Sequence, residues 1–355
     1  MSQSDDLQVR RPNSDDRDIK NTLVHPELSK EDLGASSTGQ RKYFSMYLKP
    51  ILTSRYVPVV FFLLVITAIS LIVPSFFTQR NLINILVQSS ALGLMTIGIT
   101  AVLISGGIDI SLPGLMALGG IAGVMYMREG GDPLLAGVIM IAIAVIGGAI
   151  NGFAIGYLKM IPMVVTLATM AIATGASISI TDARSVLGIH PVFSEVVLMK
   201  VLGIPMPIII LLVFTVLAAY LMRNSIYGRW LYAVGTNKKA SRVSGVPTRG
   251  VIFGTYVFAG FFAGLAAIIT TARLGAAAAS MGKEGVVLDI MSSAVVGGVS
   301  MYGGVGSALG AVIGAIIITL ISNSMNMLHV SYYITLVIKG LVIIGVVALD
   351  SLRRR

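Results

Sequence analysis

Long apolar runs separated by short polar loops dominate the chain from about residue 57 onward. An α-helix needs about 20 apolar residues to cross the hydrocarbon core of a bilayer. Ten runs approach that length, and each predicts a helix. The predicted segments are 57–74, 82–104, 110–127, 133–158, 162–181, 205–222, 250–272, 286–302, 304–324 and 331–349. The pattern therefore predicts an all-α integral membrane protein, a polytopic helical bundle of about ten transmembrane segments.

Three of these segments have weak features for full spans. Segment 110–127 begins with Ser-Leu-Pro-Gly, segment 286–302 is short, and Gly303 and Gly304 stand at its join with segment 304–324. Non-helical backbone is tolerated at membrane depth where protein encloses it. We therefore expect broken or re-entrant helices at these places.

Glycines recur at helical spacing in two segments. Gly148, Gly152 and Gly156 follow one another every four residues, as do Gly306, Gly310 and Gly314. Small residues on one helix face allow two backbones to approach closely. Both stripes therefore predict tight helix packing.

Composition supports the membrane assignment and divides the chain. Of 355 residues, 55% are apolar and 12% charged, well below the charged fraction of an ordinary soluble domain. Residues 1–56 mix nine basic with eight acidic side chains without apolar periodicity, which predicts a disordered tail. Segment 57–74 lacks a short basic start and cleavage site, so it is expected to be a retained span. The expected organisation is a tail (1–56), a transmembrane domain (57–350) and a basic end (351–355).

The net charge of +10 has a topological meaning. Cytoplasmic loops of membrane proteins carry the excess of Lys and Arg. The loop 223–249 has no acid and six basic residues: Arg223, Arg229, Lys238, Lys239, Arg242 and Arg249. With ten spans, this loop and both termini are expected on the cytoplasmic side of the membrane. The basic residues then attract anionic membrane lipid, and no nucleic acid is expected as a partner.

Several kinds of chemistry are excluded by the residues present. The chain has no cysteine, no phosphate-binding loop with its Lys-Ser/Thr, no paired carboxylates and no His spacing suited to a metal. No enzymatic activity, cofactor or metal is therefore expected. If ATP drives transport, another polypeptide must hydrolyse it.

One short helix is predicted within the basic loop. Thr236 or Asn237 can cap its N-terminus, its body runs from Lys238 to Ser244, and Gly245 can end it in the left-handed conformation. Ala240 and Val243 form a small apolar ridge, whereas Lys239 and Arg242 project elsewhere. So short a helix is marginal in water alone. It either docks in the groove of a partner protein or lies on the lipid surface.

A few polar side chains fall within apolar segments. Lys339 lies near the middle of segment 331–349, where it either lines a translocation path or makes a structural bond to helix-end carbonyls or Asp109. Asp109 either caps the helix that follows it or accepts backbone N–H groups. The other candidates for a path that carries a neutral, hydroxyl-rich solute are polar but uncharged, and each alternatively bonds within the bundle. They are Asn81, Asn84, Gln88, Asn151, Thr174 and Ser177.

Several motifs, taken in order, resemble one family. They are Phe77 to Leu86, Ser105-Gly-Gly-Ile-Asp-Ile-Ser111, Asn151-Gly152, Tyr232 to Gly245, Ala294 to Gly306, and Ile338-Lys-Gly-Leu341. Together they make residues 76–350 similar to permease subunits of bacterial ribose-type (monosaccharide) ABC importers, in the branched-chain amino acid/sugar permease superfamily. The resemblance implies a type II-like permease that pairs with a second copy or a paralogue. It also implies two ATP-binding subunits and a periplasmic or lipid-anchored sugar-binding protein.

The resemblance assigns roles to residues as well. It implies an ATPase-coupling helix at Asn237, Lys238, Lys239, Ala240, Arg242, Val243 and Gly245, and structural junctions at Gly106, Gly107, Asp109, Ser111, Gly297, Gly298, Gly303 and Gly304. The sequence departs from the family at Leu112-Pro113, at Thr174 and around Glu284, which bears on substrate and pathway. The expected function is import of a monosaccharide or polyol. The alternatives are an ion-coupled secondary transporter, for which no span offers a central carboxylate, and a branched-chain amino-acid ABC permease.

Overall fold

The computed structural model describes Thr67 and residues 76–353 of the chain. The expected tail 1–56, the predicted segment 57–74 apart from Thr67, and the last two residues lie outside this range. Almost all of the described chain is helical. The only sheet within that range is a hairpin of two strands, each of two residues.

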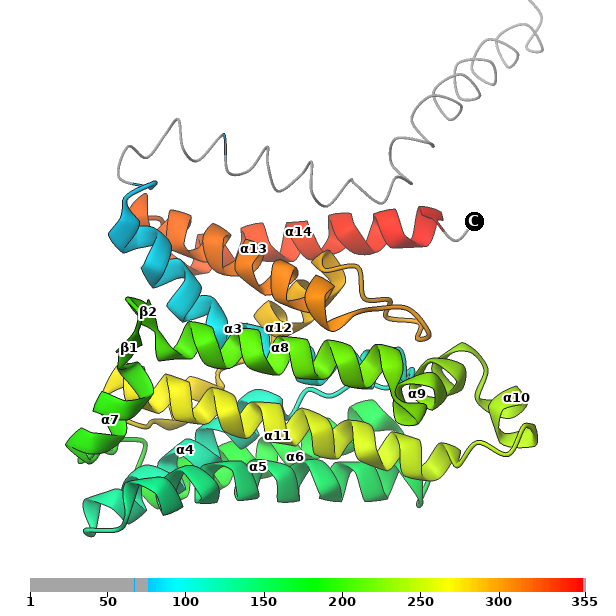
Figure 1. The fold of residues 1–355 in the computed structure, drawn as a ribbon, viewed down its shortest axis with the longest axis horizontal. Coiled ribbons are helices and arrows are strands. Elements are labelled where there is room, and N and C mark those ends of the chain that lie inside the picture. The colour runs from blue at the N-terminus through cyan, green and yellow to red at the C-terminus, as the bar shows by residue number, and fades with distance from the viewer. Residues whose placement is uncertain (1–66, 68–75, 354–355) are drawn as a thin grey trace, which may run out of the picture. The chain divides into compact units, whose positions relative to one another are not determined.

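The elements follow one another as helices joined by short loops (Figure 1). They are α3 (Gln79–Ile104), α4 (Leu112–Arg128), α5 (Pro133–Gly156), α6 (Pro162–Thr181), α7 (Pro191–Leu198), β1 (Lys200–Val201), β2 (Ile204–Pro205), α8 (Met206–Asn224), α9 (Ile226–Thr236), α10 (Lys238–Val243), α11 (Thr248–Leu274), the 3-10 turn η1 (Ala279–Gly282), α12 (Glu284–Val296), α13 (Ala308–Met327) and α14 (Tyr332–Arg353). Among the described residues, six helices are long and apolar enough to cross a membrane, namely α3, α5, α6, α8, α11 and α13.

Most of the predicted segments coincide with helices to within a few residues. The prediction was wrong for segment 286–302. Its helix, α12, has 13 residues and ends at Val296, and residues 297–307 form a loop before α13. The physical reason is glycine: Gly298, Gly303 and Gly304 have φ values of 84°, 90° and 73°, which side-chain-bearing residues rarely adopt. The expected break therefore exists but spans a longer stretch.

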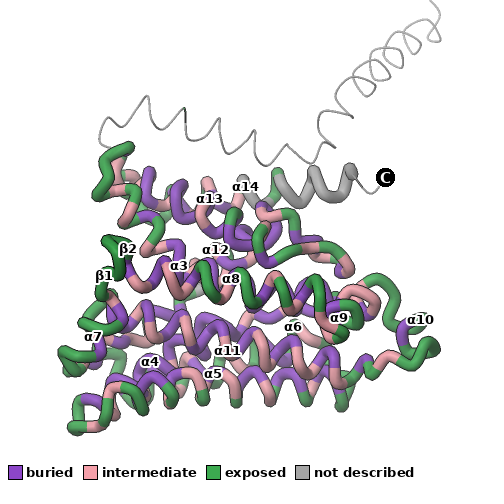
Figure 2. Tube along the Cα trace, viewed as in Figure 1, coloured by how far each residue is buried: buried purple, intermediate pink, exposed green. Residues whose placement is uncertain are grey.

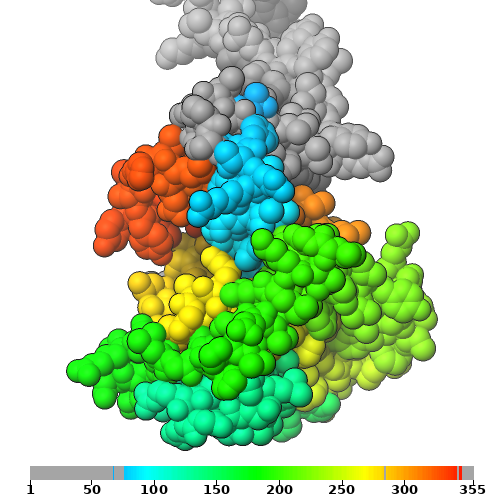
Figure 3. Space-filling view, turned by 60° about the vertical axis from the view of Figure 1, so that its left-hand side comes forward, coloured from blue at the N-terminus to red at the C-terminus, as the bar shows by residue number. Residues whose placement is uncertain are grey.

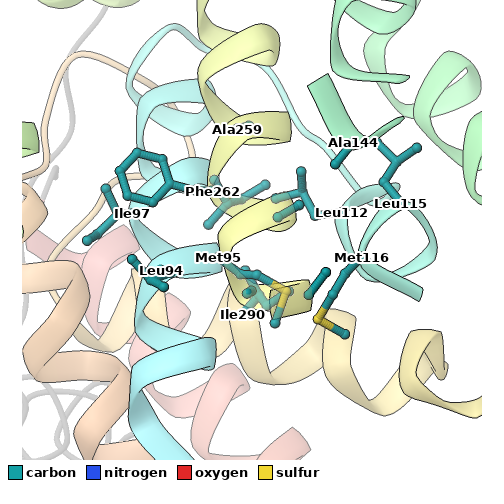
Figure 4. Close-up of a cluster of buried hydrophobic side chains, with 14 of the residues drawn as sticks. Leu94, Met95, Ile97, Leu112, Leu115, Met116, Ala144, Ala259, Phe262 and Ile290 are labelled. Carbon is teal, nitrogen blue, oxygen red and sulfur yellow. The ribbon is translucent and has the colours of Figure 1, made fainter. Parts of the chain in front are cut away.

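Helices α3, α11 and α13 are mostly buried, whereas only about a third or less of the apolar stretch of α5, α6 and α8 is buried (Figure 2). Helix α11 packs against α5, α3 and α4. Figure 4 shows where their side chains meet: Leu94 of α3, Leu115 of α4, Ala144 of α5, Phe262 of α11 and Ile290 of α12. The exposed apolar faces outside this core suit lipid or another membrane subunit, because water would hydrate them unfavourably.

Glycine makes the closest packing possible. A Cβ at Gly148 would lie 2.3 Å from the carbonyl oxygen of Tyr256, and one at Gly152 would lie 2.7 Å from that of Phe253. The stripe on α5 therefore faces α11, as its spacing predicts. The second stripe is only partly helical, because Gly306 lies in the loop before α13. Gly310 and Gly314 do pack closely, against Gly297 and Ser293.

The two ends of the bundle differ. Helix α7 and the β1–β2 hairpin lie at one end, and α9 and α10 lie at the other (Figure 1). Figure 3 brings the first end forward, where the green surface of α7 and the hairpin lies between the blue α3 and the teal start of α5. The basic loop 223–249 is thus at the opposite end from the hairpin.

Candidate coupling and translocation sites

The short helix α10 has the boundaries that its capping residues predict. The Asn237 side chain accepts a hydrogen bond from the Ala240 N–H at 3.0 Å, and Gly245 ends the turn with a φ of 81°. These two residues stabilise a six-residue helix that has little intrinsic stability. Its position at the end of the bundle leaves it accessible to a partner.

The surface of α10 carries an apolar ridge. Ala240 is exposed, and Val243 is 90% exposed, which is unusual for a branched apolar side chain. Lys239 and Arg242 are exposed beside it. The helix therefore presents a small apolar contact with basic neighbours.

The loop between α5 and α6 lies near α10. Partial burial and the positive charge of Lys159 lower the pKa of Lys238. Lys159 and the 223–249 loop are thus at the same end of the bundle, which is the arrangement expected for two loops on one side of a membrane.

Three glycine-containing segments converge directly behind α10. A Cβ at Gly235, near the end of α9, would lie 1.7 Å from the carbonyl oxygen of Ile104 and 2.7 Å from the Gly304 nitrogen. The Gly304 N–H donates to that same carbonyl oxygen at 2.9 Å. A Cβ at Gly303 would in turn lie 3.2 Å from the Gly106 Cα. The end of α3, the end of α9 and the loop 297–307 therefore contact one another through their backbones.

A side chain adds a second link between α9 and the loop 297–307. The Tyr232 hydroxyl donates to the carbonyl oxygen of Gly306 at 2.7 Å, and burial raises the pKa of this hydroxyl. Tyr232 lies one turn before Gly235 on the same helix. Helix α9 is thus tied at two points to the loop that precedes α13.

The junction between α3 and α4 contains a chain of buried polar groups. The Thr169 hydroxyl donates to Asn151 Oδ1 at 2.5 Å, and Asn151 Nδ2 donates to Ser111 Oγ at 2.9 Å. The Ser111 hydroxyl donates to Asp109 Oδ1 at 2.6 Å. This chain of hydrogen bonds connects α6, α5 and the start of α4 in the interior, where such groups must find partners.

Asp109 has the structural surroundings expected for a junction residue. Its Oδ1 also accepts the Ser111 N–H at 2.9 Å, and Ser111 is the N-cap residue of α4. Its other oxygen, Oδ2, is buried without a hydrogen-bond partner. On the other side of the junction, the Tyr256 hydroxyl donates to the carbonyl oxygen of Ile108 at 3.2 Å, which ties the junction to α11.

Lys339 forms an ion pair inside the bundle. Its Nζ lies 2.7 Å from Asp289 Oδ1 of α12, and its side chain is only 6% exposed. The prediction that Lys339 bonds to Asp109 was wrong, because Asp289 is its partner. Asp289 belongs to α12, which is too short to span the membrane, and its charge is neutralised by Lys339.

The other path candidates are spread over two helices. On α3, Asn81 donates to the Phe76 carbonyl oxygen at 2.9 Å, Asn84 is exposed and Gln88 is half-buried. On α6, the hydroxyls of Thr174 and Ser177 are buried without hydrogen-bond partners. Among the described residues, no hydrogen bond joins the α3 amides to the α6 hydroxyls. Asn151 is the one candidate that enters a network.

Sequence reasoning missed three residues of these sites, Thr169, Gly235 and Tyr256, and it did not pair Asp289 with Lys339. Gly235 precedes the cap of α10 by two residues, which is a usable signal for a close backbone approach. Asp289 is the acid that a buried lysine in an otherwise apolar span requires. Thr169 and Tyr256 carry no local signal, since only the packing of α6 and α11 brings them to the junction. No group of metal ligands occurs among the described residues.

An apolar helical bundle with buried glycine junctions and a capped basic helix at one end defines a polytopic helical membrane protein. The chain belongs to the family described as "Branched-chain amino acid transport system / permease component", whose match covers residues 81–347.

Several sugar-transport permeases are similar to the chain over most of its length. The chain is 38% identical over 299 residues to the D-allose transport system permease protein AlsC of Escherichia coli, covering 82% of this chain and 90% of the relative. It is 35% identical over 291 residues to the ribose import permease protein RbsC of Bacillus subtilis, and the match covers 81% of this chain and 90% of the relative. It is 28% identical to the xylose transport system permease protein XylH of Haemophilus influenzae, with 79% and 91% covered. No solved structure matches the chain.

Proposed function

We propose that this chain is the transmembrane permease subunit of an ABC importer that carries a monosaccharide or polyol across the bacterial inner membrane. Support comes from relatives whose names specify allose, ribose and xylose transport, matched over most of both chains. Those names favour a sugar over a branched-chain amino acid as the substrate.

ATP is hydrolysed by separate subunits in this proposal. The partners are two ATP-binding subunits, a second permease copy or paralogue, and a periplasmic or lipid-anchored sugar-binding protein. The chain has no phosphate-binding loop of its own. Both termini and the loop 223–249 face the cytoplasm, consistent with the excess of Lys and Arg in that loop.

The observation that carries the coupling role is the backbone contact behind α10. When the ATP-binding subunits close, α10 moves with them, held through its exposed Val243. Gly235 transmits this displacement to the Ile104 carbonyl because the two backbones are in direct contact. The α3–α4 junction and the α13 loop then shift together, which is a rigid-body route to alternating access.

An ion-coupled mechanism is disfavoured by the state of the carboxylates. Asp289 is paired with Lys339, and Asp109 accepts two hydrogen bonds from Ser111. A coupling acid has to exchange its ion during each cycle. The ion pair between Asp289 and Lys339 would have to break in every transport cycle.

The test is uptake by proteoliposomes that contain the permease, its ATP-binding subunits and its binding protein. We expect sugar uptake to require ATP and to persist with a protonophore. Val243→Asp in α10 should reduce co-purification of the ATP-binding subunit and abolish uptake, while Lys200→Gln at the opposite end should preserve both. Uptake driven by an ion gradient without ATP, or full uptake by Val243→Asp, would refute the proposal. Calorimetry of the binding protein with a panel of sugars identifies the substrate as the sugar that binds most tightly.

A further inference from the structure

A groove of about 830 Å³ lies where the end of α8, the start of α9 and the start of α13 meet. Its polar lining includes Arg223 and Arg229, and its apolar lining includes Val216 and Leu309. This groove adjoins the junction behind α10, since Tyr232 and Gly306 line it, and it is separate from the polar chain around Asn151. Figure 1 places α9, which forms one wall, at the same end of the bundle as α10.

The groove lies at the level of a membrane interface. Arg223 is in the last turn of α8, and Leu309 is in the first turn of α13, and both helices are long and apolar enough to span a bilayer. The ends of two adjacent spans therefore bound the groove. Tyr220, which is 65% exposed, also lines it, and tyrosine is enriched at this depth.

The polar part of the groove is positively charged and lacks an acidic partner. Arg223 and Arg229 are exposed, and no carboxylate lies within ion-pair distance of either among the described residues. Arg229 donates one hydrogen bond, to the Asn224 carbonyl oxygen at 3.3 Å, which leaves most of its donors free. Among the residues that the structure describes, no acid lines the groove. The N-terminus of the 20-residue helix α13 opens onto the same place. Its N-cap residue Ser307 accepts the Gly310 N–H at 3.1 Å, and the positive end of the helix dipole favours an anion there.

The apolar part continues along α8 toward the bilayer interior. Val216 and Leu309 are 65% and 59% exposed, and Val216 is two turns before Arg223 on α8. A ligand with an anionic group and an apolar chain satisfies both parts, whereas a free anion leaves the apolar wall uncovered. The loops 157–161, 223–249 and 297–307 of a second copy contain no Asp or Glu that could pair with the two arginines.

We infer that this groove binds an anionic phospholipid, with the phosphate at Arg223, Arg229 and the start of α13 and an acyl chain along Val216 and Leu309. Basic pockets between transmembrane helices on the cytoplasmic side are suited to anionic headgroups. Because α9 is tied to the α13 loop through Tyr232, which also lines the groove, a bound lipid contacts the elements that adjoin α10.

The inference is tested on the full-length chain alone, so its outcome does not depend on ATP-binding subunits, binding protein or sugar. The purified protein is mixed with equal amounts of phosphatidylglycerol and phosphatidylcholine, and retained lipid is counted by native mass spectrometry. The variant Arg223→Gln/Arg229→Gln is compared with Arg80→Gln/Arg184→Gln, which removes two exposed arginines outside the groove. A separate arm offers inorganic phosphate alone.

We expect wild type and the Arg80/Arg184 variant to retain phosphatidylglycerol in preference to phosphatidylcholine. The Arg223/Arg229 variant should lose about thirtyfold in phosphatidylglycerol affinity, since each basic residue near the headgroup contributes about fivefold. Leu309→Gln should also weaken lipid binding. Equal retention by both double variants, no preference for the anionic lipid, or displacement of lipid by millimolar phosphate would overturn the inference. So would efficient disulfide cross-linking of Val216→Cys in one copy to a second copy.

Discussion

Lys339 Nζ lies 2.7 Å from Asp289 Oδ1, so the lysine of α14 is neutralised by an acid of the short helix α12. Helix α12 has only 13 residues and ends in a glycine-rich loop, so it cannot span the membrane by itself. The ion pair fixes it against α14 at a depth where an unpaired charge is costly. The pair therefore has a clear structural role, whatever part it has in translocation.

Removing one partner of this pair should be more damaging than removing both. Asp289→Asn leaves the Lys339 ammonium buried without a counter-charge, and we expect a loss of about 3–5 kcal/mol in stability. The double variant Asp289→Leu/Lys339→Met removes both charges and should recover most of that loss. Thermal unfolding in detergent measures the stability of the single and the double variant. A double variant no more stable than Asp289→Asn would contradict this interpretation.

The contact between Gly235 and the Ile104 carbonyl predicts that one added methyl group lowers stability and uptake. Gly235→Ala places its Cβ on the Ile104 carbonyl oxygen, so the backbones must separate, at a cost of about 1–3 kcal/mol. We also expect ATP-dependent uptake to fall. Gly250→Ala is the matched control, because its Cβ meets no atom within 4 Å and alanine favours the helix by about 0.5–1 kcal/mol. Equal melting temperatures and uptake for the two variants would argue against the contact.

The polar chain at the α3–α4 junction can be interrupted at its centre. Asn151→Leu removes the acceptor of the Thr169 hydroxyl and the donor to Ser111 Oγ, and leaving such buried groups unpaired costs about 1–3 kcal/mol. Asn84→Leu on α3 changes an exposed amide and should stay within about 0.5 kcal/mol of wild type. Both are compared by thermal unfolding. If Asn151→Leu proved as stable as Asn84→Leu, the chain of bonds would be unimportant for folding.

The lysine pair at the α10 end predicts a pH dependence. The pKa of Lys238 is below its ordinary value of 10.5 because of partial burial and Lys159. The unfolded chain therefore binds this proton more tightly, and stability should rise as pH increases from the folded-state pKa toward 10.5. Lys159→Gln should stabilise the protein slightly at neutral pH, by less than about 0.5 kcal/mol, since the site is largely exposed.

That small gain should vanish once Lys238 is deprotonated in both states. Unfolding midpoints of Lys159→Gln and wild type, followed from neutral to strongly alkaline pH, check this expectation. Lys200→Gln at the opposite end is the control and should leave the midpoint difference flat. A benefit of Lys159→Gln that persisted at high pH would show that charge repulsion is not its cause.

The sequence by itself determined the membrane class, the positions of most helices and the boundaries of α10. These properties depend on local features: runs of apolar residues, the Asn237 cap and the conformational freedom of Gly245. The family also followed from motifs in order along the chain. Two substantial errors concern the described helices. The extent of segment 286–302 was wrong because hydropathy does not register a glycine-rich loop enclosed by protein, and α7 and α9 were not predicted because their apolar runs are shorter than a membrane span.

Only the tertiary structure decided which distant residues meet. Asp289, and not Asp109, faces Lys339, because the packing of α12 against α14 sets their relative depth. Asn151 joins Thr169 to Ser111 because three helices bring their polar faces together, and Gly235 meets Ile104 because α9 folds back over the end of α3. Such contacts join residues far apart along the chain, and their partners depend on helix positions and rotations that no local pattern specifies.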